Sequence, residues 1–279
     1  MPETSPPGHR RGFDAAAADF DALGRHLWGP IGRATVAATR PGTGDRVLDA
    51  CCGTGASAIP AARAVGTDGS VDAVDVSPPM IDIVRRAAET LPQLRGQVAD
   101  VLGWTGRDYD VVQAALGIFF FPDLVSGTRQ LIGMARPGGR IGFTIWRRGA
   151  MEVPGDHLAR AVSTVTGAPA PERQPHLINK INAAEPYAAW LESLDLTEVS
   201  VITEDLRLVL TEELAWLIIT GSGYRSAITG LSADQTSSVR DRYLATLAAD
   251  GVTEIDATTL IGLGTAPGRS PRQPAARTD

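Results

Sequence analysis

The chain of 279 residues is long enough for one large domain, and its 43% hydrophobic and 21% charged residues are ordinary for a globular protein with a substantial core. Its formal net charge of -6 and isoelectric point near 5.3 argue against a nucleic-acid partner, which usually meets a basic patch. No apolar signal-peptide core opens the chain and no window approaches ~20 unbroken apolar residues, so we expect neither secretion nor a membrane span.

Cysteine usage favours a reducing, cytoplasmic location. The two cysteines, Cys51 and Cys52, are adjacent, and neighbouring residues rarely have the geometry of a disulfide. With four His and no spaced cysteine pair, we expect no metal site. The expected partner is therefore a small molecule, and a homodimer is compatible with the sequence.

The predicted domain covers residues 12–266. The segments on either side of it, residues 1–11 and 267–279, are rich in Pro, Gly, Arg and Ser and are predicted to be disordered tails. Apolar residues at helical spacing predict helices within residues 12–40, which we expect to form a lid, and Pro41-Gly42 ends them.

Strand-like and helix-like segments alternate over residues 41–148, the predicted core. This alternation favours a parallel sheet with helices on both faces, an α/β doubly wound fold. The predicted strands are residues 46–50, 71–76, 94–99, 109–115 and 140–146. The predicted helices are residues 55–65, 78–90 and 123–135.

The alternation of strands and helices ends at residues 149–195, which have a helical pattern interrupted by several prolines and glycines. We expect this segment to be a cap that covers a substrate. Residues 196–266 then close the domain with strands at 199–210 and 257–263, and the helices between them are predicted at residues 211–220 and 233–249.

The strongest motif is Val47-Leu48-Asp49-Ala50-Cys51-Cys52-Gly53-Thr54-Gly55, in which a strand ends, a glycine-rich turn follows and a helix begins. Gly53 and Gly55 allow a tight turn and let a ligand approach the backbone. Taken alone, Gly53 to Ala58 also matches the dinucleotide pattern G-x-G-x-x-A, so a nicotinamide cofactor is the main alternative.

The charge of Asp49 distinguishes the two cofactors. A dinucleotide would place a pyrophosphate on this turn, where the carboxylate of Asp49 repels it. S-adenosylmethionine has no phosphate and carries a positive ammonium and a positive sulfonium, so an acid here is favourable. A Tyr-x-x-x-Lys pair is also missing, because Lys180 is the only lysine and no tyrosine lies four residues before it.

Two more acids follow at the ends of successive predicted strands. An acid at the position of Asp75 typically receives ribose hydroxyls. Asp100 could accept a hydrogen bond from the exocyclic amine of an adenine. Each residue could also be an ordinary loop aspartate, but the repeated placement favours a ligand.

These acids carry a family resemblance over about residues 13–146. The segments Val47–Gly55, Val74–Met80, Ala99–Val101, Ala115–Ile118 and Arg136–Arg140 resemble, in order and spacing, the class I S-adenosylmethionine-dependent methyltransferases. The resemblance is closest to the ubiquinone/menaquinone-biosynthesis (type 11) branch and its relatives that act on small natural products. It implies a Rossmann-like, seven-stranded, mostly parallel sheet whose last strand is antiparallel.

The resemblance also implies a cofactor site. Asp75 would hold the ribose, Asp100 and Val101 the adenine, and Leu116 and Gly117 the methionine end, with Met80 packed on the adenine. The full predicted set of cofactor-binding residues is Asp49, Ala50, Cys51, Gly53, Thr54, Gly55, Asp75, Val76, Met80, Asp100, Val101, Leu116 and Gly117.

One position departs from the family pattern, because Cys51 stands where the first glycine of the motif is usual. Cysteine is small enough for a ligand to come close, but a positive φ becomes more costly there. A catalytic role for Cys51 or Cys52 is disfavoured, since small buried cysteines are usually inert.

The acceptor side is less defined by the sequence. Among Phe119, Phe120 and Phe121, at least two are expected in the core, and Phe121 is the candidate to contact an acceptor; Phe20 is a second candidate, in the lid. Candidates for a general base are His157, His176 and Tyr224, and each is also compatible with a non-catalytic position.

The predicted function is methyl transfer from S-adenosylmethionine to O, N or C of a small, largely apolar metabolite, in specialised biosynthesis. Two alternatives stay open: methylation of a carbon in a quinone precursor, and a non-methylating cyclase or scaffold that binds the cofactor on the same fold.

Overall fold

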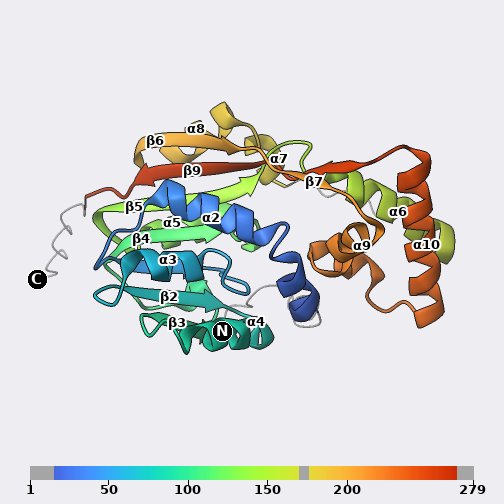
Figure 1. Ribbon diagram of the computed structural model, residues 1–279. Helices are drawn as coiled ribbons and strands as arrows, with labels where there is room; N and C mark the ends of the chain where they lie inside the picture. Colours follow the sequence, from blue (N-terminus) through green and yellow to red (C-terminus); the bar gives the residue numbers. More distant parts are fainter. Residues whose placement is uncertain (1–15, 170–175, 269–279) are drawn as a thin grey trace, which may run out of the picture.

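The computed structural model of the protein describes residues 16–169 and 176–268 (Figure 1). Residues 1–11 and most of 267–279, predicted to be tails, lie outside the described residues, and so does the start of the first predicted helix. Helical backbone is present at residues 16–23. The nine labelled α-helices are α2 Trp28–Thr39, α3 Ala58–Val65, α4 Pro78–Ala88, α5 Leu124–Ile132, α6 Glu152–Thr166, α7 Ile178–Ile181, α8 Ala184–Glu192, α9 Glu212–Thr220 and α10 Ala233–Ala249 within the described ranges.

Seven strands form the main sheet in the order β3-β2-β1-β4-β5-β9-β6. Neighbours from β3 to β5 are parallel, while β9 is antiparallel to both β5 and β6. The predicted seven-stranded, mostly parallel sheet with an antiparallel last strand is therefore confirmed. The strands are β1 Arg46–Ala50, β2 Ser70–Asp75, β3 Leu94–Val98, β4 Tyr109–Ala115, β5 Ala135–Trp146, β6 Thr197–Glu204 and β9 Thr259–Thr265.

Local sequence explains how several helices begin. Ser77 precedes α4 with Pro78 and Pro79 in its first turn, where no intrahelical N–H is needed. The Asp123 carboxylate accepts a hydrogen bond from the Ser126 N–H at the start of α5 (2.6 Å), and Ser232 with Gln235 forms a capping box on α10.

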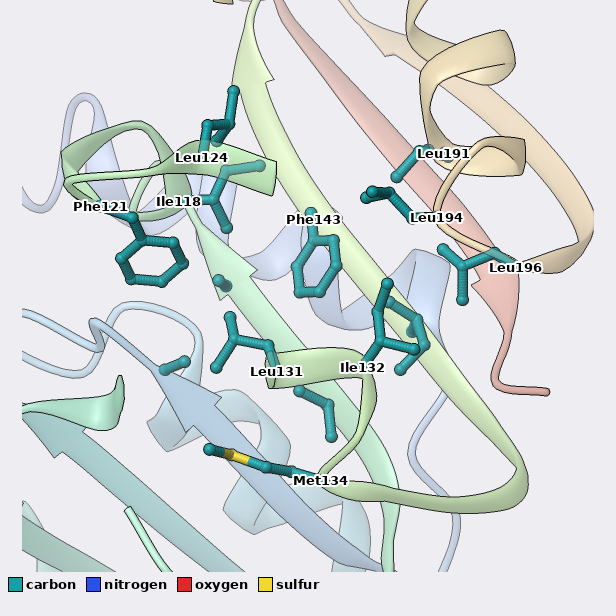
Figure 2. Close-up of a cluster of buried hydrophobic side chains, with 14 of the residues drawn as sticks. Ile118, Phe121, Leu124, Leu131, Ile132, Met134, Phe143, Leu191, Leu194 and Leu196 are labelled. Atoms are coloured by element: carbon teal, nitrogen blue, oxygen red, sulfur yellow. The ribbon is translucent and has the colours of Figure 1, made fainter. Parts of the chain in front are cut away.

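Helices cover both faces of the sheet, as the alternation predicts. On one face, α3 and α4 pack with Val47, Val71 and Val111. On the other face, α5 and α8 cover a larger cluster that includes Leu131, Phe143 and Leu191, and Figure 2 shows these side chains pointing toward one another. Both faces are buried because helices lie on each side of the parallel strands.

A second body of helices stands beyond the carboxyl ends of the central strands (Figure 1). Helices α6, α9 and α10 share a buried cluster that includes Leu158, Ile219 and Tyr243. A two-stranded ribbon of β7 Arg207–Val209 and β8 Glu254–Asp256 leads into and out of α9 and α10. We call α6, α9 and α10 the cap.

The cap boundaries predicted from the sequence need correction. The segment 149–195 divides, because α6 joins the cap while α8 packs on β6 and β9 of the sheet. The rest of the cap comes from residues 212–249, which lie between the closing strands. The single strand predicted at 199–210 is two strands, β6 in the main sheet and β7 in the ribbon.

Between sheet and cap lies a third apolar cluster. It contains Leu23 and Ile31 from the N-terminal helices, Leu116 after β4, and Met151 and Ile218 from the cap side. Among the described residues no helix combines the length and apolar character needed to cross a bilayer.

Candidate functional site

The site is built on the turn that follows β1, at the point where the order of strands reverses between β1 and β4. Cys51, Gly53 and Gly55 have φ of +55°, +53° and +93°. The Cys52 N–H donates to the Val74 carbonyl (3.1 Å), and the Gly55 carbonyl accepts from the Ile59 N–H (2.9 Å) as α3 begins. Repeated left-handed residues therefore turn the chain sharply from strand into helix.

Both glycines of the turn are needed for space as well as for conformation. A Cβ on Gly53 would lie 3.1 Å from Cε1 of Phe20, and one on Gly55 would lie 3.2 Å from the Ile59 side chain. The structure thus brings Phe20, predicted in the lid, directly against the glycine-rich turn. Met80 is also here, with its sulfur 3.9 Å from the same Gly53 position.

Cys51 is accommodated by a glycine, Gly117, that follows the neighbouring strand β4. A Cβ on Gly117 would lie 2.5 Å from the Cβ and 3.1 Å from the Sγ of Cys51. The chain therefore carries a side chain at the usual first glycine of the motif and a glycine where that side chain needs room. Burial, reinforced by Asp75, raises the pKa of the Cys51 thiol and keeps it protonated, which disfavours a nucleophilic role.

Asp49 lies on β1 and is fully buried. Its Oδ2 accepts a hydrogen bond from Gln113 (3.3 Å), whose Oε1 in turn accepts from the Thr39 hydroxyl (3.0 Å). Its Oδ1 has no hydrogen-bond partner among the described residues. Burial raises the pKa of Asp49 to about 7, so a cationic group placed beside it would stabilise the ionised form.

Asp75 ends β2 and ties the turn to the next strand. Its Oδ2 accepts from the Gly53 N–H (3.0 Å) and its Oδ1 from the Ser77 N–H (3.0 Å). The carboxylate of Asp75 therefore holds the turn after β1 against the end of β2. Val76 follows directly, half-buried, on the way to Met80 in α4.

Asp100 follows β3 and is half-buried. Its Oδ1 accepts from the Leu102 N–H (2.9 Å), which fixes the start of a short 3₁₀ turn, Val101–Gly103. Because Ala99 N–H donates to the Asp75 carbonyl (3.0 Å), this loop runs beside the end of β2. The acids predicted at successive strand ends thus lie along one edge of the sheet.

Leu116 and Gly117 complete this edge after β4. Leu116 has φ of +58° and its N–H donates to the Thr144 carbonyl (3.0 Å). Because Gly117 contacts Cys51, this segment lies against the glycine-rich turn. Ala50 and Thr54, which flank the turn residues Cys51 to Gly53, are both buried.

An aromatic row extends from the turn toward the end of β5. Phe20 stacks on Trp28, with ring centroids 4.6 Å apart and planes at 14°, and Trp28 meets Trp146 at 6.4 Å. Phe119 packs on the cluster between sheet and cap that contains Leu116. The sequence prediction placed Phe20 and Trp28 together in the lid, but it missed Trp146, which lies far away along the chain.

Phe121 does not line this region, so the structure gives no support to the prediction that it contacts an acceptor. Its ring is buried in the cluster under α5, where a Cβ on Gly127 would lie 2.6 Å from it (Figure 2). Phe119, in the 3₁₀ turn Ile118–Phe120, packs both on this cluster and on the cluster between sheet and cap.

The three candidate bases do not gather at the turn. His157 is buried between α6 and α10, with Nδ1 3.0 Å from the Thr246 hydroxyl and Nε2 3.6 Å from Asp250. Exposed His176 accepts from the Ile178 N–H through Nδ1 (3.1 Å) in the loop before α7.

Tyr224 is the only one of the three that packs on the cluster containing Leu116, and its hydroxyl donates to the Met151 carbonyl. A surface hollow of about 520 Å³ between α2 and β6 is lined by none of the predicted site residues. Among the described residues no group of three or more His, Cys, Asp or Glu could hold a metal ion.

The carboxylates and the apolar side chain at this edge of the sheet fit S-adenosylmethionine better than a dinucleotide. Asp49 offers a buried, unpaired carboxylate oxygen, which suits an ammonium and would repel a pyrophosphate. Asp75 and Asp100 add acceptors for hydroxyl and amine groups at the same edge, and the apolar Met80 suits the face of an adenine.

Comparison with known proteins gives a family for this part of the chain. Residues 47–139 match the family described as "Methyltransferase domain". The matched segment begins at β1 and ends in β5, so it contains the turn and all three acids.

Two curated relatives are methyltransferases. Aklanonic acid methyltransferase DauC of Streptomyces sp. (strain C5) is 37% identical over 137 residues, which are 47% of this chain and 62% of that protein. Nocamycin O-methyltransferase of Saccharothrix syringae is 35% identical over 138 residues, 47% of this chain and 49% of that protein. The chain therefore spans less than two thirds of the length of either relative.

Solved structures share the fold. The [4+2]-cyclase SpnF has a TM-score of 0.57 at 15% identity, covering 95% of this chain and 98% of its own. The YcgJ protein of Bacillus subtilis has a TM-score of 0.54 at 13% identity, covering 85% of this chain and 98% of its own. At these identities the likeness shows the fold alone.

Proposed function

Because residues 47–139 match the family described as "Methyltransferase domain", we propose that the protein is an S-adenosylmethionine-dependent methyltransferase. Its acceptor is a small, largely apolar metabolite, methylated at O, N or C, and its place is in specialised biosynthesis. The two curated relatives support this assignment, since each is named as a methyltransferase of one natural product.

The observation that carries the proposal is the carboxylate edge around the glycine-rich turn. Asp49, Asp75 and Asp100 end three neighbouring strands, and Asp49 keeps one buried oxygen unpaired. Such an edge attracts a cationic, hydroxyl-rich ligand and disfavours phosphates. S-adenosylmethionine supplies an activated methyl group on a positively charged sulfur, so the protein's task is chiefly alignment.

Each residue has a defined role in this proposal. Asp49 faces the ammonium, and Leu116 and Gly117 bound the methionine end. Asp75 receives the ribose hydroxyls while its bonds to backbone N–H groups hold the turn.

Asp100 and Val101 receive the adenine edge, and Met80 packs on the adenine face. The remaining residues of the predicted set, Ala50, Cys51, Gly53, Thr54, Gly55 and Val76, form the backbone surface that the ligand approaches.

The part of the site that receives the methyl acceptor must exclude water. Methylation of an ionised oxygen or an amine needs little help from a general base. The apolar cluster between sheet and cap lies against Leu116, beside the proposed methionine end. Tyr224 packs on this cluster and is the remaining base candidate, whereas His157 is held between α6 and α10.

Two other functions can be distinguished from this proposal by experiment. The fold is shared with a cyclase, so a non-methylating role is the second candidate, and a quinone-precursor C-methyltransferase differs only in its acceptor. We also propose that the protein acts in the cytoplasm, without nucleic acid, and a homodimer is the simplest assembly to test by light scattering.

Calorimetry tests the cofactor directly. We expect S-adenosylhomocysteine and S-adenosylmethionine to bind and NADPH to give no heat. Asp75→Asn should weaken S-adenosylhomocysteine at least tenfold, because a carboxylate acceptor of ligand hydroxyls is lost. Asp68→Asn, at an exposed acid before β2, is the matched control. Absence of heat with both adenosyl ligands would overturn the proposal.

A further inference from the structure

The end of β5 carries an aromatic platform on the face of the sheet that α2 covers. Trp146 is the last residue of β5 and pairs with Thr259, the first residue of β9. Directly paired residues of antiparallel strands point to the same face. Thr144, two residues earlier, contacts Thr35 of α2 through their hydroxyls (2.7 Å), so Trp146 and Thr259 also face α2.

Two buried polar atoms flank this platform without a partner. Trp28 opens α2 and packs on Trp146, and its indole Nε1 has no hydrogen-bond partner among the described residues. The hydroxyl of fully buried Thr259 is also unpartnered there. Buried polar groups are almost always hydrogen-bonded, so two unpartnered polar groups beside the Trp146 ring indicate that a ligand binds there.

The platform is connected to the proposed cofactor site. The Phe20 ring stacks on Trp28 and at the same time lies over Gly53 of the turn. Trp28, Trp146 and Phe119 all pack on the cluster that contains Leu116, which bounds the proposed methionine end. A molecule held at the platform would therefore be next to the methyl donor.

We propose that Trp28, Trp146 and Thr259 bind the methyl acceptor, and that the acceptor is a planar aromatic molecule with carbonyl or hydroxyl oxygens on its edge. Indole faces stack on flat rings. The Trp28 N–H donates to one edge oxygen, and the Thr259 hydroxyl, which both donates and accepts, suits a neighbouring one. This inference rests on the proposed methyltransferase function.

Two variants remove the unpaired polar atoms, and of these Trp28→Phe also makes the ring smaller. Trp28→Phe keeps an aromatic ring and Thr259→Val keeps the branched shape. The probe is a dihydroxyanthraquinone, which combines planar rings with carbonyl and hydroxyl oxygens. We expect each variant to bind the probe about five- to tenfold more weakly in the presence of S-adenosylhomocysteine, because one hydrogen bond is lost.

Thr259→Val should not lose stability, and Trp28→Phe should lose only what its smaller ring costs. Removing an unpaired buried polar atom leaves the free energy of unfolding unchanged or raises it, so probe affinity and stability move in different directions. A merely structural role would lower the melting temperature instead. Affinity for S-adenosylhomocysteine should be unchanged, which separates failure of this inference from failure of the cofactor assignment.

Trp190 supplies a matched control. It too stacks on an aromatic ring, Tyr187, and has a buried, unpartnered indole N–H, but it lies in the cluster under α8. Trp190→Phe should leave probe affinity unchanged. Naphthalene, which has no edge oxygens, should bind wild type and both variants equally. Equal probe affinity of wild type, Trp28→Phe and Thr259→Val would overturn the inference.

Discussion

The contact between Cys51 and Gly117 makes a sharp prediction about the turn. Gly117 has φ of -110° and ψ of -33°, a conformation that alanine adopts without strain, so Gly117→Ala tests space alone. The new Cβ would meet the Cys51 Cβ at 2.5 Å, about 1 Å closer than ordinary contact. Neither atom can rotate away, because each is attached directly to the backbone.

The expected cost follows from this overlap. Overpacking costs about 1–3 kcal/mol, and a rigid pair should fall in the upper half, about 2–3 kcal/mol. For a domain of this size that is a loss of roughly 5–10 °C in melting temperature. Affinity for S-adenosylhomocysteine should also fall, since the displaced turn carries Gly53, whose N–H is bonded to Asp75.

Cys51→Gly should rescue the defect. It removes the clashing atoms and places glycine at φ of +55°, where a side chain is strained. In that background Gly117→Ala meets only the Ala50 carbonyl, at 3.6 Å, and should cost less than about 1 kcal/mol. Urea unfolding of the four proteins, with calorimetry of S-adenosylhomocysteine, measures the coupling. An equal loss of stability in both backgrounds would refute the steric account.

Four further results are expected. Because burial raises the pKa of Asp49 to about 7, wild type should bind S-adenosylhomocysteine about tenfold more tightly at pH 8 than at pH 6, while Asp49→Asn should show no such change in calorimetry. The same shift means that the unliganded protein loses stability as pH rises from about 4 through 7, since the folded state holds a proton that the unfolded chain has released. Phe121→Leu should destabilise the fold by about 1–2 kcal/mol in urea without weakening cofactor or acceptor, whereas Phe119→Leu should weaken the acceptor; the reverse pattern would contradict the placement of the two rings. His157→Gln should leave the pH profile of the methyl-transfer rate unchanged, because His157 is packed between cap helices; if the fall in rate at low pH disappeared in this variant, His157 would be the general base after all.

The parts of the fold that depend on local pattern could be predicted from the sequence. Alternation of apolar strands and amphipathic helices predicts the parallel sheet, and Gly53 and Gly55 after a buried strand predict the turn. Pro60 lies in the first turn of α3, as its missing N–H requires. These signals lie within a few residues of one another, so no distant contact is needed to interpret them.

Features that depend on distant contacts could not be predicted in this way. The cap joins α6 to α10, and the amphipathic pattern of α8 does not say whether its apolar face meets a cap or a sheet. The segment 199–210 is different, because Glu204 and Asp205 interrupt its apolar pattern where the chain leaves the main sheet for the ribbon, so the prediction of one strand overlooked a local signal.

The same reason applies within the site. Cys51 was visible as a departure from the family pattern, but the glycine that makes room for it, Gly117, lies in a distant segment after β4. Three consecutive phenylalanines give no periodicity, so the orientation of Phe119 and Phe121 depends on the 3₁₀ turn that they form.

Transfer of an isotopically labelled methyl group tests the central claim most directly. The protein would be incubated with methyl-deuterated S-adenosylmethionine and a panel of small planar hydroxyquinones, and the Asp75→Asn variant would serve as the control. The masses of the products would be measured by mass spectrometry. The account predicts an acceptor that gains one labelled methyl group, in step with formation of S-adenosylhomocysteine, and a much slower reaction with the variant. If wild type binds the cofactor and converts an acceptor without gaining label, the methyltransferase assignment is contradicted and the cyclase reading takes its place.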